Sequence, residues 1–220
     1  GILPVRWMSH AAYDLGYPFF NHYAALPYYL SGGLTALGLG PIVAIQITQT
    51  LGFLLAATTM YLWASCVFKR RAARWLAVAA YTFAPFHLVN VYVRGDSLSE
   101  FYAFVWFPLI AWALQRWSKR RDAGSLIGAG LSYGALVLTH NVSALIFSPF
   151  AAAHSLFAVW RSGSLGLQPI RGKTVERGVR GRALSTLGLA VLPFVVGLLV
   201  TAWFWIPALF ETRYGQLGDS

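Results

Sequence analysis

Charged residues are scarce in this sequence. Only 11% of its 220 residues are Asp, Glu, Lys or Arg, whereas a soluble domain carries about 25%. Acidic residues are rarer still, with 7 Asp and Glu against 17 Lys and Arg, and hydrophobic residues make up 57% of the chain. This balance excludes an ordinary soluble domain and predicts an integral membrane protein.

Cysteine is nearly absent, since Cys66 is the single example. One cysteine excludes an internal disulfide and a cysteine-based zinc site. No two of the five histidines have the H-x-x-x-H spacing of a helical zinc site. We therefore predict no metal or other cofactor, although a pair of carboxylates near the membrane could hold a divalent cation.

Apolar runs free of charge predict an all-α, polytopic membrane protein. Residues 41–68 form a run of 28 residues, about 42 Å long as a helix and enough to cross a bilayer with tilt. Pro85 predicts a kink in the second span. The spacing of Gly130 and Gly134 permits close helix packing. Six spans are predicted, at 41–68, 75–93, 101–117, 125–139, 142–160 and 183–209.

Three parts follow from these spans. Residues 1–40 are predicted to be an external, interfacial loop with amphipathic segments, and residues 41–209 a transmembrane helical bundle. Residues 210–220 are predicted to be an external tail that starts a further loop. The chain begins at Gly1 and shows no signal peptide. We expect a piece of a longer protein that lacks at least one upstream helix.

Basic residues gather in three loops. Residues 69–74, 116–121 and 161–182 hold 4, 4 and 6 Lys or Arg residues, 14 of the 17 in the chain. The positive-inside rule places these loops in the cytoplasm. The net charge of +10 is thus a topology signal, and no nucleic-acid partner is predicted. For the loop 161–182, contact with anionic lipid is also expected.

This orientation collects the remaining polar groups on the external side. The segment 16–30, GYPFFNHYAALPYYL, is too polar and too interrupted by proline to span a bilayer, so we predict that it lies at the membrane surface and roofs a site. Aromatic rings beside amides and carboxylates suit carbohydrate, which makes Asn21, His22, Tyr23 and the upstream Asp14 candidates. The alternative is an aromatic belt, which accounts for the rings and not for the Asn-His step.

The turn RGDSLSE, residues 94–100, is the most charged motif outside the basic loops. On a helix Asp96 and Glu100 share a face, where carboxylates can act as a base, hold a divalent cation or bind sugar hydroxyls. Arg94 is suited to a phosphate. The alternative is a capping box, with Ser97 at the N-cap and Glu100 at N3.

A second polar break is Thr139-His140-Asn141. A histidine at the outer end of a span is costly unless partnered, and it can donate to a phosphate or orient a carboxylate. His140 and Asn141 are therefore candidate substrate-binding residues. The alternative is an ordinary interhelical hydrogen bond.

These motifs resemble a known family. Residues 16–29 are similar to the G-x-P-x-F-x-x-Y-x-x-L-x-Y-Y pattern of bacterial 6-pyruvoyl-tetrahydropterin-synthase-related membrane proteins, and residues 2–7 resemble their lead-in. Arg94-Gly95 with Glu100, Pro108-Leu109 and Thr139-His140-Asn141 also fall where that family has similar groups. The resemblance covers most of residues 1–150. No pterin chemistry is expected, because no soluble domain is present to hold a pterin.

The resemblance implies an architecture like that of GT-C membrane glycosyltransferases, which take a sugar from a polyprenyl-phosphate carrier on the outer side. It implies a bacterial inner-membrane protein with an external site, and membrane lipids and a polyprenyl-phosphate-linked sugar as partners. The family's prominent acidic residue lies upstream of the Arg6-Trp7 region, so Asp14 is not its equivalent. Glu100, Asp96 and Asp14 are the candidate catalytic residues in this chain.

Two other functions stay open. A transporter or flippase of lipid-linked saccharides would use the same aromatic and polar lining, but would carry ionisable groups near mid-membrane on broken helices. A non-catalytic scaffold in envelope assembly would need no reacting groups. The clustering of polar groups on one side favours the enzyme.

Overall fold

The structure is a computed structural model of the chain. It describes the backbone of residues 7–10, 13–94, 97–165 and 179–211. It describes the side chains of the same residues, except those of 21–22, 163–165 and 179–183. The regular structure of these ranges is helical, with one antiparallel bridge between Met8 and Tyr17. The all-α prediction is confirmed for the part of the chain that the structure describes.

The helical elements follow one another along the chain. In order they are α1 (Phe19–His22), α2 (Leu26–Ala36), α3 (Pro41–Val67), α4 (Arg71–Thr82), α5 (Pro85–Val89), the π-helix η1 (Asn90–Arg94), α6 (Leu98–Arg120), α7 (Ala123–Thr139), α8 (Asn141–Leu165), α9 (Val179–Val200) and α10 (Ala202–Glu211).

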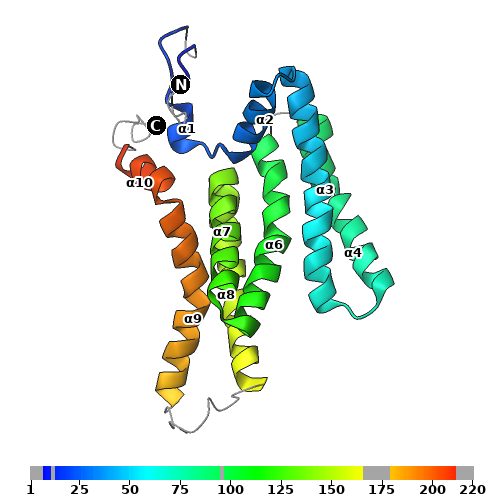
Figure 1. Ribbon diagram of the computed structural model, residues 1–220, viewed down its shortest axis with the longest axis vertical. Helices are drawn as coiled ribbons and strands as arrows, with labels where there is room; N and C mark the ends of the chain where they lie inside the picture. The colour runs from blue at the N-terminus through cyan, green and yellow to red at the C-terminus, as the bar shows by residue number, and fades with distance from the viewer. Residues whose placement is uncertain (1–6, 11–12, 95–96, 166–178, 212–220) are drawn as a thin grey trace.

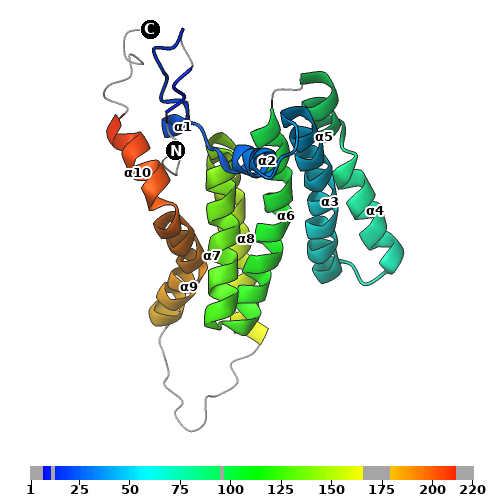
Figure 2. The ribbon, with the colours of Figure 1, turned by 45° about the horizontal axis from the view of Figure 1, so that its top comes forward.

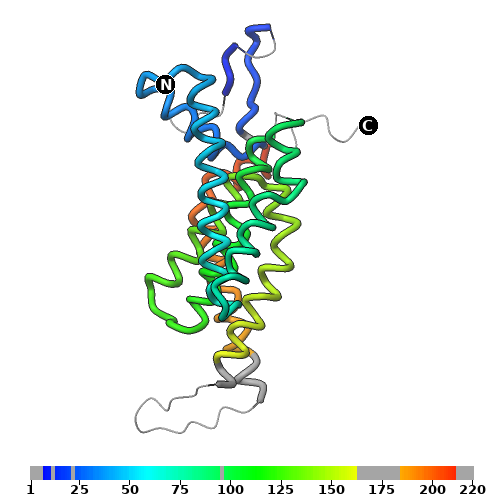
Figure 3. The backbone as a smooth tube through the Cα atoms, turned by 90° about the vertical axis from the view of Figure 1, so that its right-hand side faces the viewer, coloured from blue at the N-terminus to red at the C-terminus, as the bar shows by residue number. Residues whose placement is uncertain are grey.

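The long helices α3, α6, α7, α8 and α9 run roughly along one axis (Figures 1 and 3). Helix α6 is central and packs against α3, α7 and α8. The core lies between these helices and includes the fully buried Ile110, Leu114 and Leu136. We call the end that carries α1, α2 and α10 the upper end, and the end that carries the α3–α4 and α6–α7 turns the lower end (Figure 1).

Among the described residues, three helical segments are long and apolar enough to cross a membrane, namely Pro41–Val67, Arg71–Arg94 and Asn141–Ser162. A fourth candidate is the bent pair Leu184–Val200 and Ala202–Glu211. Helix α7 is apolar but shorter, and α6 carries charges at both of its ends. The structure therefore supports three or four candidate spans, and the count of six stays a prediction.

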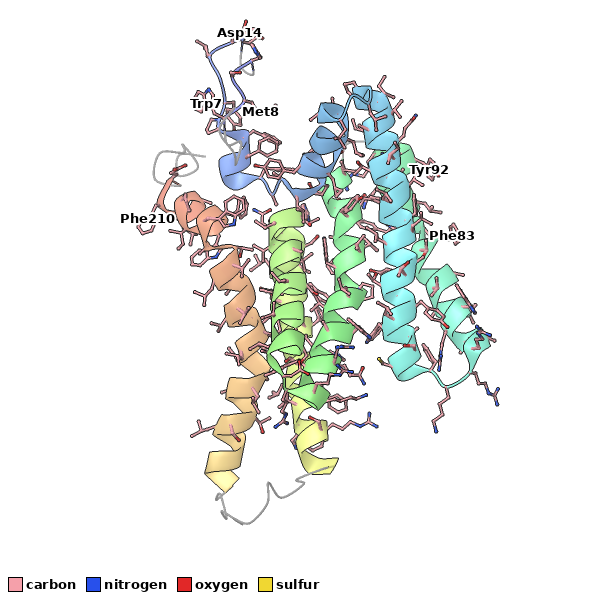
Figure 4. The ribbon with its side chains drawn as sticks, viewed as in Figure 1. Trp7, Met8, Asp14, Phe83, Tyr92 and Phe210 are labelled. Atoms are coloured by element: carbon pink, nitrogen blue, oxygen red, sulfur yellow. The ribbon has the colours of Figure 1, made fainter. Side chains whose placement is uncertain are left out.

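Apolar side chains cover the outside of the bundle. Ile42, Leu76, Leu145 and Leu199 are each more than 65% exposed, and Phe83 and Tyr92 point outward from the α4–η1 segment (Figure 4). Such a surface is unfavourable in water and favourable in lipid. Together with the length of the apolar helices, it indicates a membrane protein.

Helices α7 and α9 approach closely through glycine. A Cβ atom added at Gly197 of α9 would lie 2.7 Å from the carbonyl oxygen of Gly130 and 3.1 Å from the amide nitrogen of Gly134. The close packing that the spacing of Gly130 and Gly134 predicted is thus present, and α9 is the partner helix. Small residues allow two backbones to approach in this way.

The second predicted span is interrupted where Pro85 indicated. Helix α4 ends at Thr82 and α5 begins at Pro85, because proline has no N–H to donate to the preceding turn. His87 follows on α5, fully buried, with its ring stacked between Phe101 and Phe104 of α6 at centroid distances of 4.6 Å. The break is therefore packed against the first turns of α6.

The last predicted span, 183–209, is not one straight helix. Helices α9 and α10 meet at Thr201 with a bend of 72°. The Thr201 hydroxyl donates to the Gly197 carbonyl at 2.9 Å, and the Trp205 indole N–H donates to the Leu198 carbonyl at 2.9 Å. A side chain that bonds to carbonyls of the preceding turn opens a helix and bends it.

The aromatic segment 16–30 lies across the upper end (Figure 2). Helix α2 packs on α3, α6 and α7. Ala24 and Pro27 are buried, and the Ser31 hydroxyl donates to the Thr48 hydroxyl of α3 at 3.2 Å. The segment is a packed part of the fold that covers the ends of these helices.

Candidate functional site

The candidate site begins where η1 meets α6 at the upper end. Arg94 is the last residue of η1, and Glu100 lies in the first turn of α6. The Arg94 Nη1 donates to Glu100 Oε2 at 3.0 Å, and these side chains are 49% and 24% exposed. Both charges are accessible from solvent, so an ion pair of this kind stabilises the fold little. The guanidinium has five N–H donors and retains several for a ligand.

The capping-box alternative for this turn is not realised. Ser97 is the N-cap of α6, as the sequence indicated, but its side chain makes no capping hydrogen bond. The Glu100 carboxylate bonds to Arg94 instead of reaching back to the backbone. Glu100 is therefore directed to the upper surface by a cation from the neighbouring element.

His140 lies at the junction of α7 and α8, outside both helices, and is half-buried. Its Nδ1 accepts the Ser143 backbone N–H at 3.3 Å and lies 2.7 Å from the Ser143 hydroxyl. An Nδ1 that accepts places the proton of the neutral ring on Nε2. Burial lowers the pKa of His140, and the Glu100 carboxylate raises this pKa by a smaller amount. Burial therefore favours the neutral form of His140, and the Glu100 charge acts against it.

The aromatic segment joins this group through α6. The Ser99 hydroxyl lies 3.5 Å from the Ala24 carbonyl, next to Glu100 in sequence. Tyr23 is partly buried, and its ring packs on Phe19 and Tyr28 at centroid distances of 4.8 and 6.0 Å. The backbone of Asn21 and His22 belongs to α1, and their side chains lie outside the described part of the structure.

An apolar pocket lies between α2, α6, α7 and the α9–α10 junction. Its volume is about 340 Å³, and its lining includes Leu26 of α2, Trp106 of α6, Leu138 of α7 and Thr201. The Trp106 indole N–H donates to the Thr139 hydroxyl at 2.7 Å, one residue before His140. The pocket therefore begins within a turn of His140 and extends into the bundle beneath α2.

Two predicted site residues are not brought into this group, and a third is untested. Asp14 lies at the tip of the N-terminal segment, above the helices (Figure 4), where its 80% exposed carboxylate pairs with His10 at 3.1 Å. Asn141 is exposed, and its Oδ1 accepts the Val142 N–H at 3.1 Å. Asp96 lies outside the described residues.

The sequence did not single out Asn90 or Ser143, which complete the surroundings of the site. Asn90 is 2% exposed, its Oδ1 lies 3.5 Å from Arg94 Nη1, and its Nδ2 has no hydrogen-bond partner. Asn90 stands four residues before Arg94, and this spacing could have indicated from the sequence that the two side chains lie on one helix face. Ser143 similarly stands three residues after His140.

No group of three or more His, Cys, Asp or Glu side chains with metal-binding geometry occurs among the residues that the structure describes. Arg94 and Glu100 instead form a cation–carboxylate pair, and the Glu100 charge acts on the pKa of His140. This arrangement can hold an anion through Arg94 and His140 and accept a proton at Glu100.

The fold and site define a helical protein with long apolar helices and a polar group at one end. No family model and no solved structure matches the chain. The chain is similar to a protein of Lactococcus lactis subsp. cremoris (strain MG1363) described as an uncharacterized protein, with 22% identity over 140 residues. The match covers 64% of this chain and 20% of that protein, so the chain spans about a fifth of its length.

Proposed function

We propose that this chain is part of a membrane glycosyltransferase of the GT-C type, which transfers a sugar from a polyprenyl-phosphate donor to an external acceptor. The observation that carries the proposal is the Arg94–Glu100 ion pair, whose carboxylate acts on the pKa of His140, together with an apolar pocket that is lined up to Leu138, two residues before His140. A lipid-linked sugar phosphate has the complementary parts, namely an anion next to a long hydrocarbon chain.

The chemistry assigns one role to each side chain. The acceptor hydroxyl oxygen attacks the anomeric carbon of the donor sugar, and Glu100 takes the hydroxyl proton. The bond between that carbon and the phosphate oxygen breaks, and polyprenyl phosphate leaves. Arg94 and the Nε2–H of His140 hold the phosphate as its charge grows. Burial favours the neutral form of His140, which leaves Nε2 as a donor.

The remaining parts of the protein fit this reaction. The pocket beneath α2 would receive the first isoprene units of the donor, and Tyr23 with the neighbouring rings would face the sugar. Six spans, with the basic loops in the cytoplasm, would place the site on the external face of a bacterial inner membrane. The motif resemblance to the 6-pyruvoyl-tetrahydropterin-synthase-related membrane proteins supports the same reading.

Transfer assays with the full-length protein in membranes test the proposal. Undecaprenyl phosphate carrying radiolabelled mannose or glucose is the donor, and release of undecaprenyl phosphate is measured. We expect Glu100→Gln and Arg94→Ala each to lower the rate by about 100-fold or more. Arg71→Gln, which removes an exposed lower-end cation, is the control. Unchanged rates in both site variants would refute the assignment.

A second function is favoured by the buried polar groups at the α4–α5 break. His87 is 0% exposed and its Nε2 has no hydrogen-bond partner, and Asn90 lies nearby on η1. Polar groups on a broken helix are typical of transporters, so a flippase of lipid-linked saccharides is the alternative. Movement of a fluorescent lipid-linked sugar across vesicles without hydrolysis, abolished by His87→Ala, would favour it. Absence of both activities would indicate a scaffold.

A further inference from the structure

A recess runs along α3 and α6 from the middle of the bundle toward its lower end, away from the candidate site, and α8 forms a further wall of its upper part. Its larger part has a volume of about 360 Å³ and is lined by side chains that include Met60 and Trp63 of α3, Phe107 and Ala111 of α6 and Phe150 of α8. His154 also lines it, but its Nε2 bonds to the Ala111 carbonyl at 3.1 Å. The recess therefore presents mainly carbon, which suits a hydrocarbon chain.

A smaller, basic pocket continues the recess toward the lower end. It has a volume of about 190 Å³ and is lined by Cys66, Trp112, Gln115, Arg116, Lys119 and Arg120. Cys66 follows Trp63 by three residues on α3, and Trp112 follows Ala111 on α6. The two parts are therefore neighbours on both helices, within about one turn.

The charge of the smaller pocket is strongly positive. Arg116, Lys119 and Arg120 are spaced three and four residues apart and share one face of α6. The Arg116 guanidinium lies 5.5 Å from the centre of the Trp112 ring, which holds it over the pocket wall. Among the described residues, one acidic group, Asp122, interacts electrostatically with Arg116 and Arg120. Its carboxylate also caps α7, where it accepts the Ser125 N–H at 2.7 Å. The smaller pocket therefore keeps a net positive charge that can bind an anionic ligand.

We propose that this α3–α6 recess binds an anionic phospholipid. One acyl chain lies in the apolar part, and the phosphate lies against Arg116, Lys119 and Arg120. A soluble anion does not need the apolar part, and a zwitterionic lipid does not need three cations. Basic pockets between membrane helices are known to hold anionic headgroups. This lipid is separate from the proposed sugar donor, because it binds at the opposite end of the bundle.

Lipid binding by the full-length protein in detergent tests the proposal. Phosphatidylglycerol and phosphatidylcholine are added separately, and bound lipid is measured by native mass spectrometry. We expect phosphatidylglycerol to bind at least 10-fold more tightly. Arg116→Gln combined with Lys119→Gln should weaken its binding by about 10-fold or more, since hydrogen bonds to charged groups are lost.

The control is Arg70→Gln combined with Arg71→Gln. These exposed residues of the α3–α4 turn lie at the same end and carry the same charge, but do not line the recess. We expect less than a 2-fold effect. Equal losses in both double variants, equal binding of the two lipids, or displacement of the lipid by millimolar inorganic phosphate would each overturn the proposal. If the double variant does not fold, Lys119→Gln alone is used, with an expected loss of at least 3-fold.

Discussion

Gly197 offers a sharp test of the contact between α7 and α9. In Gly197→Ala the new methyl group would lie 2.7 Å from the Gly130 carbonyl oxygen and 2.8 Å from Cδ1 of Tyr133. The first of these neighbours is backbone, so the helices must separate to admit the methyl group. Overpacking of this kind costs about 1–3 kcal/mol, which corresponds to roughly 5- to 150-fold in the unfolding equilibrium.

Gly188→Ala is the matched control, on the same helix. No atom lies within 4 Å of a Cβ added at Gly188. This substitution meets no steric opposition and gains helix propensity, which contributes up to about 1 kcal/mol. Because both substitutions gain the same helix propensity, the two variants are expected to differ by the steric cost alone, about 1–3 kcal/mol.

Unfolding of the purified protein in mixed micelles of dodecyl maltoside and sodium dodecyl sulfate measures this difference, with far-ultraviolet circular dichroism as the signal. Gly197→Ala should unfold at a lower fraction of sodium dodecyl sulfate than the unmodified protein, and Gly188→Ala at the same or a higher fraction. The same midpoint for both variants would refute the close approach of α7 and α9.

Three further predictions concern the upper and lower ends. A double-mutant cycle of Arg94→Ala and Glu100→Ala should give a coupling of about 0–1 kcal/mol, because the pair is exposed, and a coupling well above this would contradict the solvent-accessible geometry. Burial lowers the pKa of His140, so the unfolded state binds the proton more tightly. Stability should therefore fall as the pH drops below the ordinary histidine value of 6.5, and His140→Gln should flatten that part of the stability profile. Ser97→Ala should change stability by less than about 0.5 kcal/mol, since Ser97 makes no capping bond. Asp122→Ala should lower the thermal midpoint, since Asp122 caps α7; equal midpoints for these two variants would contradict the capping assignments.

The existence and limits of most helices could be predicted from the sequence. Helix α3 covers Pro41–Val67, where the charge-free run 41–68 predicted it. A long apolar run satisfies its backbone hydrogen bonds as a helix in the membrane, and the basic cluster after it marks where the helix ends. Pro85 marked the break in the second span for an equally local reason. The bend at Thr201 could not be foreseen, since threonine is common in straight helices and its bend depends on the Trp205 contact across the junction.

The candidate site was predictable in part. Charge sorting placed Arg94, Glu100 and His140 at one end of the bundle. The structure pairs Arg94 with Glu100, and the Glu100 charge acts on the pKa of His140. The pairing of Arg94 with Glu100 depends on the π-helix η1, whose geometry no spacing rule gives. The favourable S-x-x-E pattern at Ser97 indicated a capping box, but the nearby guanidinium competes for the Glu100 carboxylate.

The first turn of α6 has a consequence for the selectivity of whatever binds beside Glu100. Leu98, Ser99, Phe101 and Tyr102 are all buried around it, so the backbone under this carboxylate is already ordered before a ligand arrives. The loss of conformational entropy on binding then falls mainly on the ligand. We expect rigid ring-shaped molecules to bind here more tightly than flexible chains with the same polar groups.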